Sequence, residues 1–218
     1  MHKVTPKDFG LRCVSNFARP KPFSEDFIVR FVTTALQEFG SCGIAATSFA
    51  KQEGDRLFGY GVSFSLFGGN ATFVLGRDGL VSSLVNGQSQ QDAELIKDLL
   101  NRAHKCLPEL DKITHLMTAF CHAEFLGADS VEKVFQSLVV ATGAVKAIGI
   151  SVLSQDAADI LLPANERVRL DIAPSELREN RLFMSWQFTA RGTVSDDYWE
   201  TLGPRLKALA GRLGIELV

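Results

Sequence analysis

Apolar residues first recur at helical spacing in the region of residues 25–39. They form one wide stripe, which consists of Phe27, Ile28, Phe31, Val32, Ala35, Leu36 and Phe39. This spacing predicts a helix over Glu25–Phe39 with one buried face. Ser24 is its expected N-cap, because a hydroxyl can accept a hydrogen bond from an otherwise unpaired amide of the first turn. Before this helix, Leu11–Phe17 is predicted to form a strand.

The apolar pattern then changes to a period of two. The residues that point one way are Phe58, Tyr60, Val62, Phe64 and Leu66, and they alternate with glycine and serine. A half-buried strand has this pattern. Glycine-containing turns at 68–70 and 77–79 flank a strand over 71–75 and introduce another over 80–85, which predicts an antiparallel meander. A second helix is expected after Ser89, with Leu95, Ile96, Leu99, Leu100, Ala103 and Leu107 on its inner face.

The rest of the chain follows a similar order. A strand is predicted over Ile113–Phe125, and Asp129 with Glu132 then has the spacing of a capping box. The stripe of the helix that follows consists of Val131, Val134, Phe135, Leu138 and Val139. Further strands are expected over 145–153, 168–172 and 182–188. The last helical region, about 196–213, contains Gly203-Pro204, which predicts either a kink or two short helices.

These patterns predict an internal duplication. Ser24 and Ser130 open corresponding helices, and Gly43 and Gly149 follow them at the same offset. We expect an α+β protein made of two pseudo-repeats of approximately β-α-β-β-β-β-α, with mainly antiparallel sheets and helices packed on one face. Residues 1–218 would form one compact unit, with a first repeat over 8–108 and a second over 111–218.

The element order resembles, in topology, the repeated unit of TATA-binding-protein-like folds. That resemblance implies two halves that form a curved saddle. DNA-binding saddles carry basic and intercalating residues on the concave face, whereas the outward positions here are largely glycine, serine, threonine and glutamine. The resemblance therefore carries an expectation about fold and none about DNA binding.

Composition and charge narrow the function classes. The 218 residues carry a formal net charge of −2, so a general attraction to phosphate backbones is not expected, and nucleic acid is an unfavoured partner. Neither an apolar N-terminal leader nor a membrane-length apolar run occurs in the sequence, which predicts a cytoplasmic protein without a membrane partner. Export without a standard signal is the alternative. The four cysteines form no C-x-x-C pair and are expected to be thiols. Cys13 and Cys106 have no evident activating base in the sequence.

Candidate chemistry is sparse. The fragment His122-Ala123-Glu124 would place an imidazole and a carboxylate on one face of a strand, but a zinc deaminase would also need a downstream P-C-x-x-C motif. His115 and His122 are seven positions apart and so are expected on opposite faces of a regular strand. A tertiary site of Cys121, His122 and a distant carboxylate stays open. The sequence assigns no catalytic residue, no cofactor-binding residue and no metal ligand.

The predicted outward face of the sheet remains as an interaction surface. Its candidate partner-binding residues are Ser63, Ser65, Ser83, Ser185, Gln187, Thr189 and Arg191. Small hydrogen-bonding side chains allow another protein to approach closely. A solvated sheet face is the alternative interpretation of the same residues.

The leading hypothesis is a non-enzymatic, cytosolic protein-binding module. An immunity protein or inhibitor that neutralises a toxin is one form of it, because such proteins are small and free of catalytic motifs. The first alternative is an enzyme or small-ligand-binding protein with a site between the two repeats, where His122 and Glu124 could take part. The second alternative is a nucleic-acid-binding saddle.

Overall fold

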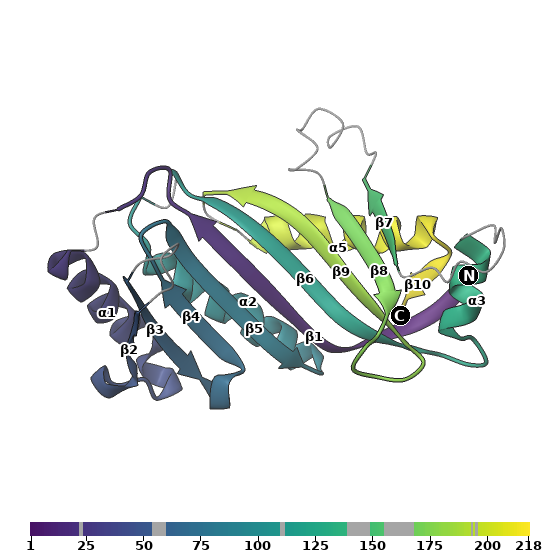
Figure 1. Ribbon diagram of the computed structural model, residues 1–218, viewed down its shortest axis with the longest axis horizontal. Coiled ribbons are helices and arrows are strands. Elements are labelled where there is room, and N and C mark those ends of the chain that lie inside the picture. Colours follow the sequence, from purple (N-terminus) through teal and green to yellow (C-terminus); the bar gives the residue numbers. More distant parts are fainter. Residues whose placement is uncertain are drawn as a thin grey trace. The chain divides into compact units, whose positions relative to one another are not determined.

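The computed structural model describes residues 1–21, 24–53, 60–109, 112–138, 149–154, 168–192, 194 and 196–218. In chain order its helices and strands are β1 (His2–Asn16), α1 (Glu25–Phe39), β2 (Ala50–Glu53), β3 (Tyr60–Leu66), β4 (Ala71–Leu75), β5 (Gly79–Gly87), α2 (Gln90–Lys105), β6 (Thr114–Phe125), α3 (Val131–Leu138), β7 (Ile150–Leu153), β8 (Arg169–Pro174), β9 (Arg181–Arg191), α5 (Asp196–Arg212) and β10 (Ile215–Leu217). Figure 1 shows these elements along the chain. None of the helices in the described part of the chain combines the length and hydrophobicity that a membrane span needs.

The described strands are arranged in the order β2-β3-β4-β5-β1-β6-β9-β8-β7, with β10 paired to β1. The β2–β3, β3–β4, β4–β5, β7–β8 and β8–β9 pairs are antiparallel, and the β1–β10 pair is parallel. Helices and a mainly antiparallel sheet confirm the α+β class. The order β1-α1-β2-β3-β4-β5-α2 equals the one predicted for the first repeat, whereas the described second half has three strands between its helices. The duplication and the saddle topology therefore stay predictions.

The chain divides into two compact units. Unit 1 comprises 1–9, 118–189 and 195–218, and unit 2 comprises 10–117 and 190–194. The division runs through three strands, so β1 belongs to unit 1 through Phe9 and to unit 2 from Gly10.

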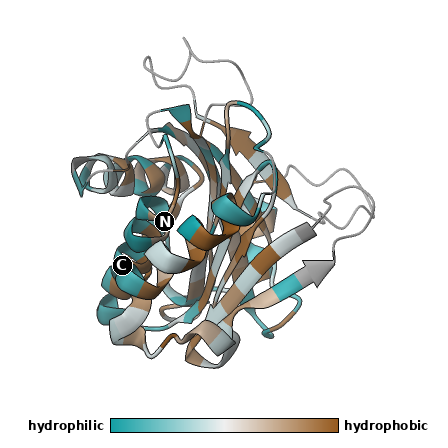
Figure 2. Cartoon of the chain, turned by 90° about the vertical axis from the view of Figure 1, so that its left-hand side faces the viewer, coloured by the Kyte–Doolittle hydropathy of each residue, from teal (hydrophilic) through white to brown (hydrophobic). Residues whose placement is uncertain are grey.

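In unit 2, α1 and α2 cover one face of the meander β3-β4-β5. Phe39 of α1 packs against Phe64 of β3 and Phe73 of β4, with ring centroids 5.3 and 5.1 Å apart, and Phe64 stacks on Phe73 at 4.8 Å. Burying each of these rings contributes about 1.5 to 3 kcal/mol. Figure 2 shows the helices on one side of the strands and the alternation of hydrophobic and hydrophilic residues along the strands nearest the viewer.

Local signals set the starts of both helices of unit 2, α1 and α2. The Ser24 hydroxyl accepts a hydrogen bond from the Phe27 amide at 3.3 Å, as the N-cap prediction required. Ser89 accepts from the Asp92 amide at 3.2 Å, and the Asp92 carboxylate accepts from the Ser89 amide at 2.9 Å. This reciprocal capping box satisfies two amides of the first turn of α2.

In unit 1, α5 packs on β8 and β9. Phe188 of β9 meets Trp199 of α5 edge to face at 6.3 Å. Of the two forms predicted for the final helical region, the alternative of two short helices is wrong, because α5 continues through Gly203-Pro204 from Asp196 to Arg212. A kink at Pro204 stays a prediction. A proline removes one backbone hydrogen bond from a helix, and burial of Leu202 and Leu209 on either side of it favours a continuous helix.

Three further differences concern strands. β1 begins at His2, well before the predicted start, and its first residues pair with β10, which the sequence did not predict. The predicted order included a strand in the place of β2 but gave it no residue range, and β2 pairs with β3 through Ala50 and Ser63. Phe58, Val139 and residues 145–148, which the predictions included, lie outside the described residues.

Candidate functional site

The predicted partner-binding residues of unit 2 lie on β3 and β5, on the face opposite the helices. Cross-strand pairing places Ser63 opposite Val74, and Val74 opposite Val81, as one row across the sheet. A second row consists of Ser65, Thr72 and Ser83. Ser65 is exposed, Ser83 is half-buried, and Ser63 is buried with 7% of its surface exposed.

The remaining predicted residues lie on β9. Ser185 is opposite Asp171 and is buried, while half-buried Gln187 is opposite Arg169. Arg169 and Asp171 form an ion pair at 3.0 Å, so this part of the sheet in unit 1 carries charge. The two others lie at the end of the strand: half-buried Thr189, whose carbonyl accepts a hydrogen bond from Tyr198, and exposed Arg191.

His122 and Glu124 have separate partners in unit 1. His122 Nδ1 lies 2.9 Å from the Ser175 hydroxyl, whereas Glu124 lies 3.7 Å from Arg181. Burial lowers the pKa of His122, with a smaller opposing effect from Asp8. His122 is therefore a largely buried, hydrogen-bonded side chain. Within the described residues it is linked to Glu124 through Arg181, which pairs with Glu124 and also contributes to lowering the pKa of His122.

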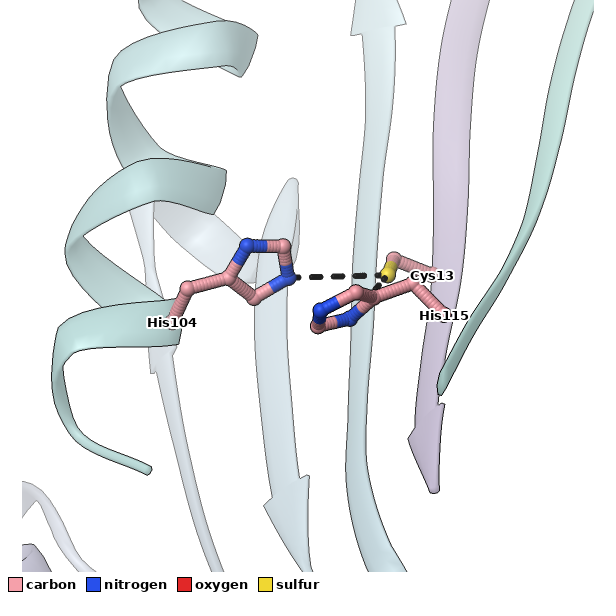
Figure 3. Close-up of side chains that lie close together, drawn as sticks. All are labelled: Cys13, His104 and His115. Carbon is pink, nitrogen blue, oxygen red and sulfur yellow. Dashed lines mark hydrogen bonds between the residues drawn. The ribbon is translucent and has the colours of Figure 1, made fainter. Parts of the chain in front are cut away.

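A buried polar cluster in unit 2 was missed by the sequence analysis. Cys13 of β1, His104 of α2 and His115 of β6 converge beneath the sheet, as Figure 3 shows. The Cys13 Sγ atom lies 3.7 Å from His104 Nε2 and 4.0 Å from His115 Nδ1. Exposure of these three side chains is 0, 3 and 0% respectively. Cys13 therefore does have two imidazole neighbours, contrary to the expectation from the sequence.

The Ser15 hydroxyl lies among the three. Its Oγ atom is 2.8 Å from His115 Nδ1, 3.4 Å from His104 Nε2 and 3.5 Å from Cys13 Sγ. On the far side of the ring, His115 Nε2 lies 2.8 Å from the carbonyl oxygen of Gly192. Because a carbonyl only accepts, Nε2 carries the proton and donates it, which leaves Nδ1 unprotonated, with a lone pair that faces the cluster and accepts a hydrogen bond from the Ser15 hydroxyl.

Burial keeps the members of this cluster neutral. It raises the pKa of the Cys13 thiol to about 11, against a smaller lowering by the Ser15 hydrogen bond. It also lowers the pKa of His104 to about 3, with a further contribution from His115. The pKa of His115 is lowered by burial too, and the Gly192 hydrogen bond opposes that effect. A protonated, fully buried thiol is a poor nucleophile, so the arrangement does not suit covalent catalysis.

A sequence signal for the cluster exists in hindsight. Cys13 and Ser15 alternate with Arg12 and Val14 in the first predicted strand, so they share the inward face with Leu11. His104 continues the buried stripe of α2, and such a polar residue on an inward face needs a polar partner.

The cavities of unit 2 lie elsewhere. One groove of about 640 Å³ lies between the start of α1 and the end of α2, and its lining includes Phe27, Arg30 and Lys105. None of the cluster residues lines this groove.

The sequence matches no known family model and no curated protein sequence.

Proposed function

We propose that the protein is a non-enzymatic protein-binding module that binds its partner through the sheet face of unit 2 opposite the helices. We call this surface the open face, and define it as Ser65, Thr72, Val74, Val81 and Ser83. The observation that supports the proposal is the chemistry of this face. Five adjacent half-buried or exposed side chains on β3, β4 and β5 are small, and none of them is charged.

This composition differs from that of an ordinary solvated sheet face. Antiparallel sheets with one face in water usually carry polar and charged side chains there. The centres of protein interfaces, in contrast, are depleted in charged residues. Val74 and Val81 pair directly across two strands and provide an apolar centre, with hydroxyl groups beside it.

The hydroxyl groups on the open face are already partly satisfied. Ser65 Oγ and Thr72 Oγ1 lie 3.1 Å apart, and Thr72 donates to the Gly69 carbonyl oxygen at 3.3 Å. Covering these groups with a partner therefore leaves fewer unpaired polar atoms than covering free hydroxyls would. Valine, threonine and serine also lose little rotamer entropy on binding.

A charge in this face should prevent binding without unfolding the protein. The full-length chain and its S65R and V29R variants would be used as baits in cells of the source organism, with chemical crosslinking and mass spectrometry. Val29 is the matched control because it is 54% exposed and lies on α1, away from the open face. We expect one stoichiometric partner, at least about tenfold weaker capture by S65R, and unchanged capture by V29R.

The outcomes separate the proposal from its alternatives. Equal capture by S65R and the unsubstituted chain would exclude the open face as the binding surface. Loss of capture in both variants would indicate a general folding defect, and circular dichroism of each variant checks that before capture is compared. A toxin-neutralising role is one form of this function, and the identity of the captured protein would distinguish it from others.

A further inference from the structure

The buried cluster of unit 2 contains three donor atoms of the types that bind transition metals. They are Cys13 Sγ, His104 Nε2 and His115 Nδ1, and all three lie within 4.8 Å of one another. They come from β1, α2 and β6, so no two of them are neighbours in sequence. In Figure 3 both imidazoles direct a ring nitrogen towards the sulfur atom.

The distances are close to those of a tetrahedral zinc centre. Zn–S and Zn–N bonds of about 2.3 and 2.0 to 2.1 Å place sulfur and nitrogen ligands about 3.6 Å apart. The observed separations from Cys13 Sγ are 3.7 Å to His104 and 4.0 Å to His115. Movements of a few tenths of an ångström would bring these two sulfur–nitrogen separations to the zinc value, and His104 Nε2 and His115 Nδ1 lie within 4.8 Å of each other. The Ser15 oxygen is at 2.8 to 3.5 Å from all three ligand atoms and provides an oxygen at the fourth position.

The surroundings of His115 supply the orientation that a metal ligand needs. Its Nε2–H donates to the Gly192 carbonyl oxygen at 2.8 Å, which holds the ring and fixes the tautomer in which Nδ1 is unprotonated. Metal-binding histidines usually donate their second ring nitrogen to a carbonyl or carboxylate in this way. This contact is an observation separate from the clustering itself, and it points to the same three-ligand centre.

We propose that Cys13, His104 and His115 bind one Zn²⁺ ion, with a neutral oxygen from Ser15 or a water held by it as the fourth ligand. Thiolate and imidazole ligands favour zinc over magnesium and calcium, which prefer oxygen. On binding, the Cys13 thiol loses its proton to solvent and its sulfur forms the bond to zinc. The ion would link β1, α2 and β6 in the interior of unit 2 and stabilise its fold. This proposal does not depend on the proposed partner-binding function.

Cobalt substitution tests the site directly. The full-length protein would be stripped of metal with a chelator under reducing conditions and titrated with Co²⁺. We expect one Co²⁺ per chain, visible d–d absorption of a tetrahedral ion, a thiolate-to-cobalt charge-transfer band, and displacement of both by Zn²⁺. In C13S the charge-transfer band should be lost, and H104Q should weaken binding by at least about 100-fold.

C106S is the matched control. Cys106 is also a buried thiol of unit 2, but its Sγ lies 3.3 Å from the Arg102 carbonyl oxygen, and within the described residues this sulfur contacts neither imidazole of the cluster. C106S should therefore bind Co²⁺ as the unsubstituted chain does. A wild-type chain with no charge-transfer band, or a band that survives in C13S, would overturn the proposal.

X-ray absorption of the zinc-loaded wild-type protein decides the matter if C13S fails to fold. The proposal requires one sulfur at about 2.3 Å and nitrogen or oxygen ligands at about 2.0 to 2.1 Å. A first shell without sulfur, or with more than one sulfur, would exclude this centre. Wild-type protein that binds no zinc would show that the cluster is a neutral hydrogen-bonded network.

Discussion

Replacement of Gly79 by alanine should destabilise unit 2 by about 3 kcal/mol. A Cβ atom at this position would lie 1.9 Å from the carbonyl oxygen of Ser15 and 2.9 Å from its carbonyl carbon. Ordinary van der Waals contact begins at 3.4 Å, so β1 and β5 would have to separate by about 1.5 Å at this point. Both atoms belong to backbone, which cannot move aside as a flexible side chain can.

The magnitude has two parts. Overpacking of a close contact costs about 1 to 3 kcal/mol. The separation would also break the nearby hydrogen bond from the Phe17 amide to the Asp78 carbonyl oxygen, now 2.8 Å, which contributes about 1 kcal/mol. A total of about 3 kcal/mol corresponds to a change of about 100-fold in the unfolding equilibrium constant.

Urea denaturation followed by far-ultraviolet circular dichroism measures this effect. Both tryptophans, Trp186 and Trp199, belong to unit 1, so tryptophan fluorescence would not report on unit 2. The expected decrease in the midpoint is about 1 to 2 M. G76A is the control in the same turn, because a Cβ there would meet its nearest atom at 4.0 Å. If G79A and G76A have midpoints within experimental error of each other, the close approach of Gly79 to Ser15 is wrong.

Three further predictions follow from burial. F73A should lower the free energy of unfolding by about 3 to 5 kcal/mol, because the Phe73 ring is fully buried between aromatic neighbours. A decrease of less than about 1 kcal/mol in urea titrations would contradict the packing described for unit 2. In native protein, Ellman's reagent should modify the half-buried Cys42 before Cys121, because burial raises the pKa of the Cys121 thiol to about 12. Equal rates of modification would show that Cys121 is accessible. Burial lowers the pKa of His122 below 6.5, so the folded state binds fewer protons there and loses stability as pH falls below about 6.5. The H122N variant should reduce that dependence in denaturation series between about pH 6.5 and 5, while His104 and His115, whose pKa values burial also lowers, keep part of the slope. An unchanged slope in H122N would assign the dependence to those groups alone.

Elements with strong local signals were predictable from sequence. Helix α1 has the predicted bounds, and β4 matches its predicted range, because a helical stripe and glycine-containing turns are properties of neighbouring residues. Strands without such signals were not located. β2 is short, and β10 is defined by its parallel pairing with residues near the N-terminus, so its existence depends on a distant partner.

The residues of the proposed binding surface were also predictable from sequence only in part. Alternation along β3 and β5 indicated that Ser65 and Ser83 share a face, but only the cross-strand register brought Val74 and Val81 into the same surface. The burial of Ser63 and Ser185 was also decided by neighbouring strands. Period-two patterns give the face of a residue, whereas exposure depends on what lies beside it.

The sequence by itself determined the α+β class, the caps of α1 and α2 and the inward faces of the main elements, since each depends on residues a few positions apart. The predicted Asp129–Glu132 capping box was wrong, because Ser130 accepts the hydrogen bond from the Lys133 amide at the start of α3 and Asp129 pairs with His2. The tertiary structure alone decided that Cys13 meets His104 and His115, which are 91 and 102 positions away. Chain spacing carries no information about such a contact, because strand order and helix packing bring the three side chains together. The physical reason is that local hydrogen bonding and periodicity act over one or two turns, while a buried site is assembled by the packing of separate elements.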